Sequence, residues 1–196
     1  DQWISEGFSQ YFAALYAGKS RGEDLFNQLL RRMAQWARKE GDAGPISLGY
    51  RLGHIEGDSR VFRAIVYNKS ASVLHMLRRT IGDEAFFRGV RQFYFEWRFR
   101  KAGTDDVRRA FERESGRPLK GFFDTWIDGF GTPQVAVTWV TTAGAASPAV
   151  VLRVEQRGRH HEFPVTATVR YAGGDTADHQ IFVSERVAEF TLPLTG

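Results

Sequence analysis

The chain has 196 residues, of which 42% are hydrophobic and 14% aromatic, and its formal net charge is +4. A chain of this length buries about 70% of the surface that its unfolded form exposes, so we expect a globular protein. The absence of Cys excludes disulfides, cysteine-based zinc ribbons and a thiol nucleophile. No apolar run approaches the roughly 18 residues that span a bilayer, and we expect no signal peptide within the chain.

Helical periodicity dominates residues 1–133. Apolar side chains recur about every 3.6 residues in four stretches, which predicts helices at roughly 6–17, 23–39, 61–80 and 84–98. Thr104 is a candidate N-cap for a further helix, and Pro118 fits the first position of the last one. Residues 41–60 are rich in Gly and are expected to form a long loop.

Beyond Pro133 the apolar spacing changes to two. Val135, Val137 and Trp139 alternate with polar or small residues, and the same alternation returns at 150–154, 165–169 and 190–194. Short alternating segments separated by Gly, Ala and Ser predict an antiparallel β-sandwich, with a turn at 173–175. We therefore expect an α+β fold, with a helical domain at 1–133 and a small β-sandwich domain at 134–196.

Glu6 places one carboxylate at the start of an aromatic, amphipathic helix, because Phe8, Tyr11, Phe12, Leu15 and Tyr16 follow it at helical spacing. One interpretation is a first-turn carboxylate that interacts with the helix dipole, worth about 0.3–1 kcal/mol. The other is a metal ligand that points into a cleft. The pattern alone favours the first interpretation. In the same way, Tyr67 alone is best interpreted as a packed tyrosine with a satisfied hydroxyl.

Two segments carry a family resemblance. Residues 3–12 read W-I-S-E-G-F-S-Q-Y-F and resemble the segment that carries the third zinc ligand in the membrane alanyl aminopeptidase (gluzincin) family, usually W-L-N-E-G-F-A. Residues 66–71 read V-Y-N-K-S-A and resemble that family's Y-x-K-G-A stretch, with Ser70 in place of Gly. A shorter match lies between these two segments at 45–48. Others follow them at 76–77, 81–82, 104–106, 122–126 and 131–133.

The resemblance implies a zinc metallopeptidase that removes N-terminal residues from peptides with a free N-terminus. It implies that Glu6 is the oxygen ligand of a catalytic Zn²⁺ and that the Tyr67 hydroxyl faces the substrate carbonyl. Its fold would be the C-terminal part of a thermolysin-like catalytic domain, followed by a β-sandwich. Lys69 would orient the phenol or pair with a carboxylate, although a single Lys is ordinarily exposed to solvent.

The family's other two zinc ligands and its general base lie in an H-E-x-x-H helix, which this chain lacks. The family spacing places that motif upstream of Asp1, so we expect a fragment of a longer protein. His160, His161 and Glu162 lack a second His at the required offset, and the segment reads as a strand. His54 and His75 have no partner at a ligand offset and are expected not to bind metal.

Counting ligands therefore predicts that the intact parent is a zinc aminopeptidase, whereas these 196 residues alone bind no catalytic zinc and are inactive. An alternative is a non-catalytic relative that acts as a protein-binding scaffold. Nucleic-acid binding is disfavoured: residues 1–133 hold 22 of the 27 basic residues, but also 17 of the 23 acidic ones. Interspersed charges of this kind are typical of a solvated surface.

Overall fold

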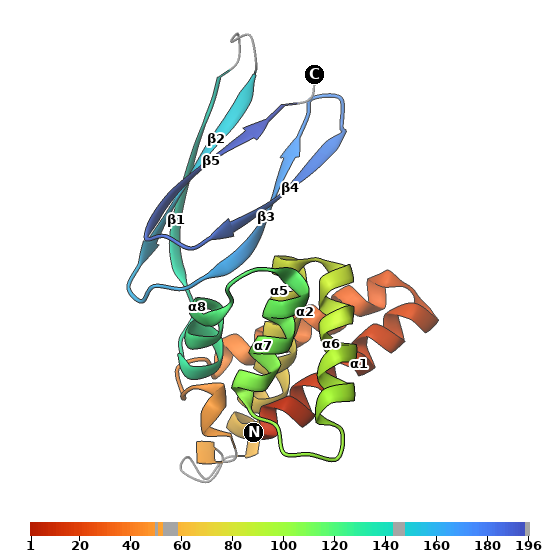
Figure 1. Ribbon diagram of the computed structural model, residues 1–196. Coiled ribbons are helices and arrows are strands. Elements are labelled where there is room, and N and C mark those ends of the chain that lie inside the picture. The colour runs from red at the N-terminus through yellow and green to blue at the C-terminus, as the bar shows by residue number, and fades with distance from the viewer. Residues whose placement is uncertain (50, 53–58, 143–147, 195–196) are drawn as a thin grey trace. The chain divides into compact units, whose positions relative to one another are not determined.

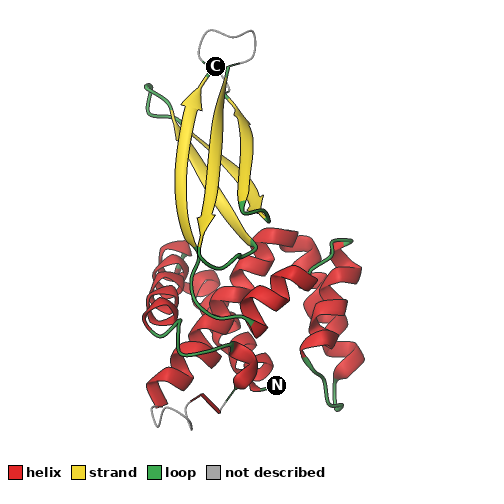
Figure 2. Cartoon of the chain, turned by 90° about the vertical axis from the view of Figure 1, so that its left-hand side faces the viewer, coloured by secondary structure: helices red, strands yellow, loops and turns green. Residues whose placement is uncertain are grey.

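A computed structural model describes residues 1–49, 51–52, 59–142 and 148–194 of the chain. The chain forms two compact units, a helical one over Asp1–Thr132 and a β-sheet one over Pro133–Gly196 (Figure 1). Helices and antiparallel strands occupy separate parts of the chain (Figure 2), which confirms the predicted α+β class. No helix in the described part of the chain is both long enough and apolar enough to cross a membrane.

The longer helices of the first unit are α1 (Gln2–Arg21), α2 (Glu23–Lys39), α5 (Ser70–Ile81), α6 (Asp83–Trp97) and α7 (Thr104–Ser115). The shorter elements are η1 (Ile46–Leu48), α4 (Ser59–Phe62), η2 (Arg63–Lys69), α8 (Lys120–Phe123) and η3 (Asp124–Asp128). The four predicted helices are all confirmed, and the one predicted at 61–80 is made of α4, η2 and α5 in succession. The middle part, η2, is a π-helix.

Two predicted helix starts were wrong by one or two residues. Gly103 is the N-cap of α7, and Thr104 is its first helical residue. The Thr104 hydroxyl is engaged in long-range hydrogen bonds to Asp1 and Trp3, while Asp106 accepts the Gly103 N–H at 2.9 Å. Pro118 lies before α8, whose N-cap is Leu119. Residues 50 and 53–58 of the predicted long loop, His54 among them, lie outside the described residues.

The buried face of α1 differs from the predicted one. It consists of Trp3, Gly7, Tyr11 and Ala14, whereas Tyr16 of the predicted stripe is 75% exposed. Helix α1 carries apolar residues on two sides, and periodicity cannot tell which side packs inward. Tyr11 packs edge-on against Phe86 of α6, and Phe86 stacks on Phe111 of α7 at a centroid distance of 5.3 Å. These rings form the centre of the helical core.

A polar network crosses the same core. The Arg78 guanidinium donates to the Tyr11 hydroxyl at 3.5 Å and to the Asp83 carboxylate at 2.8 Å. Because a guanidinium only donates, the Tyr11 hydroxyl is free to donate to Nδ1 of His75, 3.1 Å away. Burial, followed by the charges of Arg78 and Arg79, lowers the pKa of His75 to about 4. His75 is therefore a neutral structural residue of the helical core.

The neutral state of His75 predicts a pH-dependent stability. The unfolded chain takes up this proton below the ordinary pKa of 6.5, whereas the folded chain does so only below about 4. The unfolded state thus binds more protons in this window, and stability falls as the pH falls from 6.5 to 4, by up to about 3 kcal/mol. Urea denaturation at several pH values should show a shallower loss for His75→Gln than for the wild type. His160→Gln, which removes an exposed imidazole, should keep the wild-type slope; equal slopes for all three proteins would contradict the prediction.

The second unit contains two antiparallel sheets. Strands β1 (Gln134–Thr141), β2 (Ala149–Arg157) and β5 (Val187–Pro193) form one, in the order β1-β2-β5. Strands β3 (Phe163–Arg170) and β4 (Thr176–Val183) form the other. Both sheets line one open cavity of about 550 Å³, so their apolar faces oppose each other. His160 and His161 precede β3, so the strand expected at this segment begins later, at Phe163.

Candidate active site

Glu6 lies in the second turn of α1, whose beginning is held by α7. The Asp1 carboxylate accepts hydrogen bonds from the Thr104 backbone N–H at 2.8 Å and from its hydroxyl at 2.9 Å. The indole N–H of Trp3 donates to the same hydroxyl oxygen at 2.9 Å, and Trp3 is 1% exposed. Three hydrogen bonds thus fix the first turn of α1 against the first turn of α7. The Glu6 carboxylate, one turn later, therefore lies on a helix whose beginning is fixed in place.

Gly7, the neighbour of Glu6, lets α1 approach the start of α5 unusually closely. A Cβ atom at Gly7 would lie 2.6 Å from Cβ of Ser70, closer than two such atoms pack. Ser70 is fully buried, and its hydroxyl donates to the Ile65 carbonyl at 3.3 Å. Ser70 occupies the position at which the family motif has Gly. At this point of contact Ser70 therefore contributes a Cβ atom, and there is no room for a second one at position 7.

Tyr67 lies on the π-helical segment η2 directly before this contact. The Asn68 side chain donates to the Arg63 carbonyl at 3.1 Å, five residues back, and so supplements the wide backbone turn. The Tyr67 ring packs edge-on against Phe62 at a centroid distance of 5.7 Å. A π-helical turn shifts the side chains that follow relative to an α-helix, and such turns are frequent at functional sites. Here the π-helical segment contributes Tyr67 to the surface beside α1.

The structure brings Glu6 and Tyr67 together. A hydrogen bond to the Glu6 carboxylate is the largest cause of a raised pKa at the Tyr67 phenol; desolvation and the charge of Glu6 act in the same direction. The charge of Arg63 opposes them. The phenol therefore stays protonated at neutral pH and can donate a hydrogen bond. Arg63 was not predicted as a site residue, although its place four residues before Tyr67 on a helix is a usable signal.

The described residues do not by themselves complete a metal site. They contain no group of three or more His, Cys, Asp or Glu side chains placed to hold a metal ion. A catalytic zinc typically has three protein ligands, and Glu6 would supply one. His75 points its Nδ1 at Tyr11, and His161 at the Arg159 carbonyl, 3.0 Å away. Any imidazole ligands beside Glu6 would have to come from elsewhere.

Lys69 is buried, contrary to the exposed position expected of a single Lys. It is 4% exposed, and within the described structure its Nζ atom has no hydrogen-bond partner. Burial lowers the pKa of Lys69 to about 8, and the charge of Asp42 only partly opposes the shift. Its ammonium group is therefore poorly solvated and unpaired within the described structure.

The buried ammonium predicts that Lys69→Met stabilises the fold at neutral pH. The folded chain releases the proton of Lys69 near pH 8, the unfolded chain only near 10.5. Wild-type stability therefore rises relative to the variant between pH 8 and 10.5, and the variant should be more stable at pH 7 by up to about 3 kcal/mol. Denaturation at pH 7 and pH 10.5 measures both differences. Lys101→Met, at an exposed site, should change stability by less than about 0.5 kcal/mol. A less stable Lys69→Met protein at pH 7 would contradict this prediction.

The Gly7 contact predicts strong coupling between positions 7 and 70. Ala has a higher helix propensity than Gly by about 1 kcal/mol, but with Ser70 present the added Cβ overpacks the interface at a cost of about 1–3 kcal/mol. Gly7→Ala should therefore destabilise the wild type and become neutral or stabilising in a Ser70→Gly background. A double-mutant cycle in urea measures the coupling, expected at about 2 kcal/mol. Additive effects of the two substitutions would show that the helices can move apart freely.

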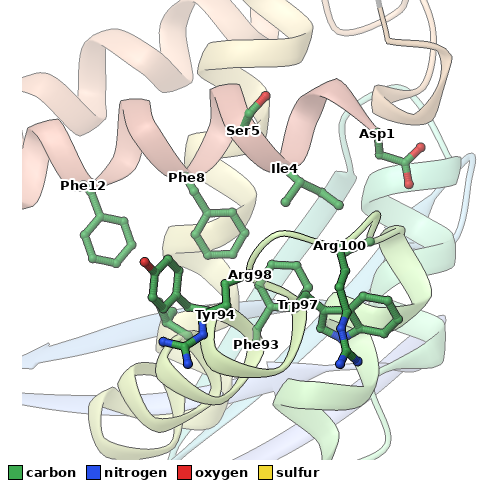
Figure 3. Close-up of a pocket in the computed structure, with 12 residues that line it drawn as sticks. Asp1, Ile4, Ser5, Phe8, Phe12, Phe93, Tyr94, Trp97, Arg98 and Arg100 are labelled. Atoms are coloured by element: carbon green, nitrogen blue, oxygen red, sulfur yellow. The ribbon is translucent and has the colours of Figure 1, made fainter.

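A separate apolar groove lies between α1 and α6, and neither Glu6 nor Tyr67 lines it. Its volume is about 480 Å³. Figure 3 shows Phe8 and Phe12 of α1 pointing toward Phe93 and Tyr94 of α6. Helix α1 thus presents one side to the core, another to Tyr67 and a third to this groove. Of the predicted α1 stripe, Phe8 and Phe12 line the groove, whereas Tyr11 packs in the core.

Comparison with known proteins places the chain in a family. Residues 1–126 match the model of the peptidase family M1 domain, and the chain belongs to this family. It is 30% identical over 139 residues to a glutamyl aminopeptidase of Bitis rhinoceros, covering 70% of this chain and 15% of that protein. It is 26% identical over 171 residues to an aminopeptidase N of Lactococcus lactis subsp. lactis, covering 84% of this chain and 20% of that protein. The resemblance predicted from residues 3–12 and 66–71 is thereby confirmed.

A solved structure shares the fold. The crystal structure of Legionella pneumophila aminopeptidase A in complex with aspartic acid matches with a TM-score of 0.79 at 22% sequence identity. The match covers 98% of this chain and 21% of that one. The present chain thus spans only 15–21% of the length of the relatives named here.

Proposed function

We propose that this chain is the part of a zinc-dependent aminopeptidase that supplies one metal ligand and one transition-state hydrogen bond. The observation that carries the proposal is the placement of the Glu6 carboxylate beside the Tyr67 phenol, on two helices held in close contact at Gly7 and Ser70. Membership of the M1 family supports the reaction class. The substrate would be a peptide with a free N-terminus, as the aminopeptidase relatives suggest.

Glu6 would be the oxygen ligand of the zinc ion. A zinc ion bound there supplies Lewis acidity and an acidified water molecule. Two further ligands would come from an H-E-x-x-H segment outside these 196 residues, as the family resemblance implies. The restrained first turns of α1 would hold the Glu6 carboxylate in position before a metal binds. Affinity depends on the assembled ligand set, so the isolated chain should bind zinc weakly.

Tyr67 would stabilise the scissile carbonyl oxygen as it gains negative charge. Its raised pKa keeps the hydroxyl protonated at neutral pH, which a hydrogen-bond donor requires. The Glu6 carboxylate contributes most to this raised pKa, so the phenol would act beside the proposed metal ligand. Removal of a donor of this kind typically lowers kcat by about 10²–10³-fold.

Two measurements test this assignment. The isolated 196-residue chain should show no zinc-dependent hydrolysis of aminoacyl-arylamides and no tight site in a zinc titration. The full-length protein should hydrolyse these substrates. Glu6→Gln should lose bound zinc and activity together, whereas Tyr67→Phe should keep zinc and lose about 10²–10³-fold in kcat.

Matched controls remove the same groups from exposed positions. Glu23→Gln and Tyr94→Phe, at exposed sites on α2 and α6, should leave zinc content and kcat unchanged. Zinc-dependent turnover by the isolated chain would contradict the claim that it is inactive. Full kcat in Tyr67→Phe would remove Tyr67 from the mechanism. A full-length protein that contains no zinc and hydrolyses no arylamide would instead support the non-catalytic scaffold.

A further inference from the structure

Arg63 carries an exposed positive charge next to Tyr67. It is the first residue of η2, and Tyr67 follows four residues later, about one turn along the same helix. The two side chains therefore lie on the same side of the helix.

The guanidinium of Arg63 is available to an external anion. In the part of the chain that the structure describes, Arg63 makes no ion pair and no side-chain hydrogen bond, in contrast to Arg78, Arg88, Arg108 and Arg113. Its side chain is exposed. Lys69, at the other end of η2, is buried, so it does not provide a competing charge at this surface. A guanidinium binds carboxylates in a planar, bidentate geometry.

We propose that Arg63 selects peptide substrates that carry a carboxylate next to the scissile carbonyl. The proposal rests on the proposed function, because it takes the Tyr67 hydroxyl as the marker of the scissile carbonyl oxygen. A substrate carbonyl held at Tyr67 brings the side chains of its first and second residues to within reach of the long, flexible Arg63. An Asp or Glu at one of these positions would pair with the guanidinium, whereas Asn or Gln would gain no charge interaction. Arg63 would thus be a specificity-determining residue rather than a catalytic one.

The size of the effect follows from exposure. An ion pair in contact with solvent contributes little, so the preference for acidic over amide side chains should be about two- to five-fold. It should shrink as the salt concentration rises from 0.05 to 0.5 M, because exposed charges are screened over about 10 Å at 0.1 M. The preference should appear mainly in KM, since the interaction is formed equally in the bound substrate and in the transition state.

The test compares isosteric substrates in the full-length protein. One arm uses Glu- and Gln-arylamides, which differ at the first residue. The other uses Ala-Glu-amide and Ala-Gln-amide, which differ at the second residue and carry no terminal carboxylate. The ratio of kcat/KM for Glu over Gln is measured in the wild type, Arg63→Gln, Arg63→Glu and Arg63→Lys. Arg91→Gln removes an exposed guanidinium from α6 and serves as the matched control.

In one of the two arms, Arg63→Gln should lower the Glu/Gln ratio about two- to five-fold and Arg63→Glu should lower it further. Arg63→Lys should retain most of the preference, and Arg91→Gln all of it. An unchanged ratio in both arms, in a folded Arg63→Gln protein that still hydrolyses Ala-arylamide, overturns the inference. Dissociation constants for the same peptides, measured on the same proteins, keep the two proposals separate. A wild type without hydrolysis contradicts the proposed function, whereas a charge preference in binding that Arg63→Gln abolishes still supports the role of Arg63.

Discussion

The closeness of α1 and α5 at Gly7 and Ser70 is the constraint on which the candidate site depends. Glu6 precedes one of these residues by a single position, and Tyr67 precedes the other by three. Because only the Cβ atom of Ser70 lies between the two helices at this point, side chains next to it on α1 and η2 are held close together. A Gly in a helix interior costs about 0.5–1 kcal/mol relative to Ala. That cost is offset here by the close approach that only a residue without a side chain permits.

The helix formed by α4, η2 and α5 carries ionisable side chains both at the surface and in the core, where burial disfavours their charged forms. Tyr67 and Arg63 lie on its outer side, where Glu6 also acts on the phenol. Lys69 and His75 point inward, and burial lowers the pKa of both. Arg63, Tyr67 and Lys69 all belong to the π-helical segment η2, and such segments are frequent at functional sites.

Periodicity predicted the existence of the helices and the change to strands near Pro133, because each depends on local spacing. Periodicity failed where two faces of one helix were equally apolar. Helix α1 carries apolar residues on more than one side, and Gly7, which has no side chain, decided the packing. Lys69 was expected in solvent because nothing in a single sequence distinguishes a buried Lys from an exposed one. The proximity of Glu6 and Tyr67 has no local signature, and only the family resemblance pointed to the pair.

The described contacts that hold α1 beside α5 and α7 lie within the helical unit. Asp1 and Trp3 fix the first turn of α1 through Thr104, and Gly7 fixes the second turn through Ser70. A ligand held in this way loses little conformational entropy when a cation binds, and the cost of ordering it is met during folding. The proposed division of the metal site between this chain and a second segment is then physically reasonable. Helix packing orders the Glu6 carboxylate in this chain. The second segment would then only have to place its two imidazoles beside that carboxylate.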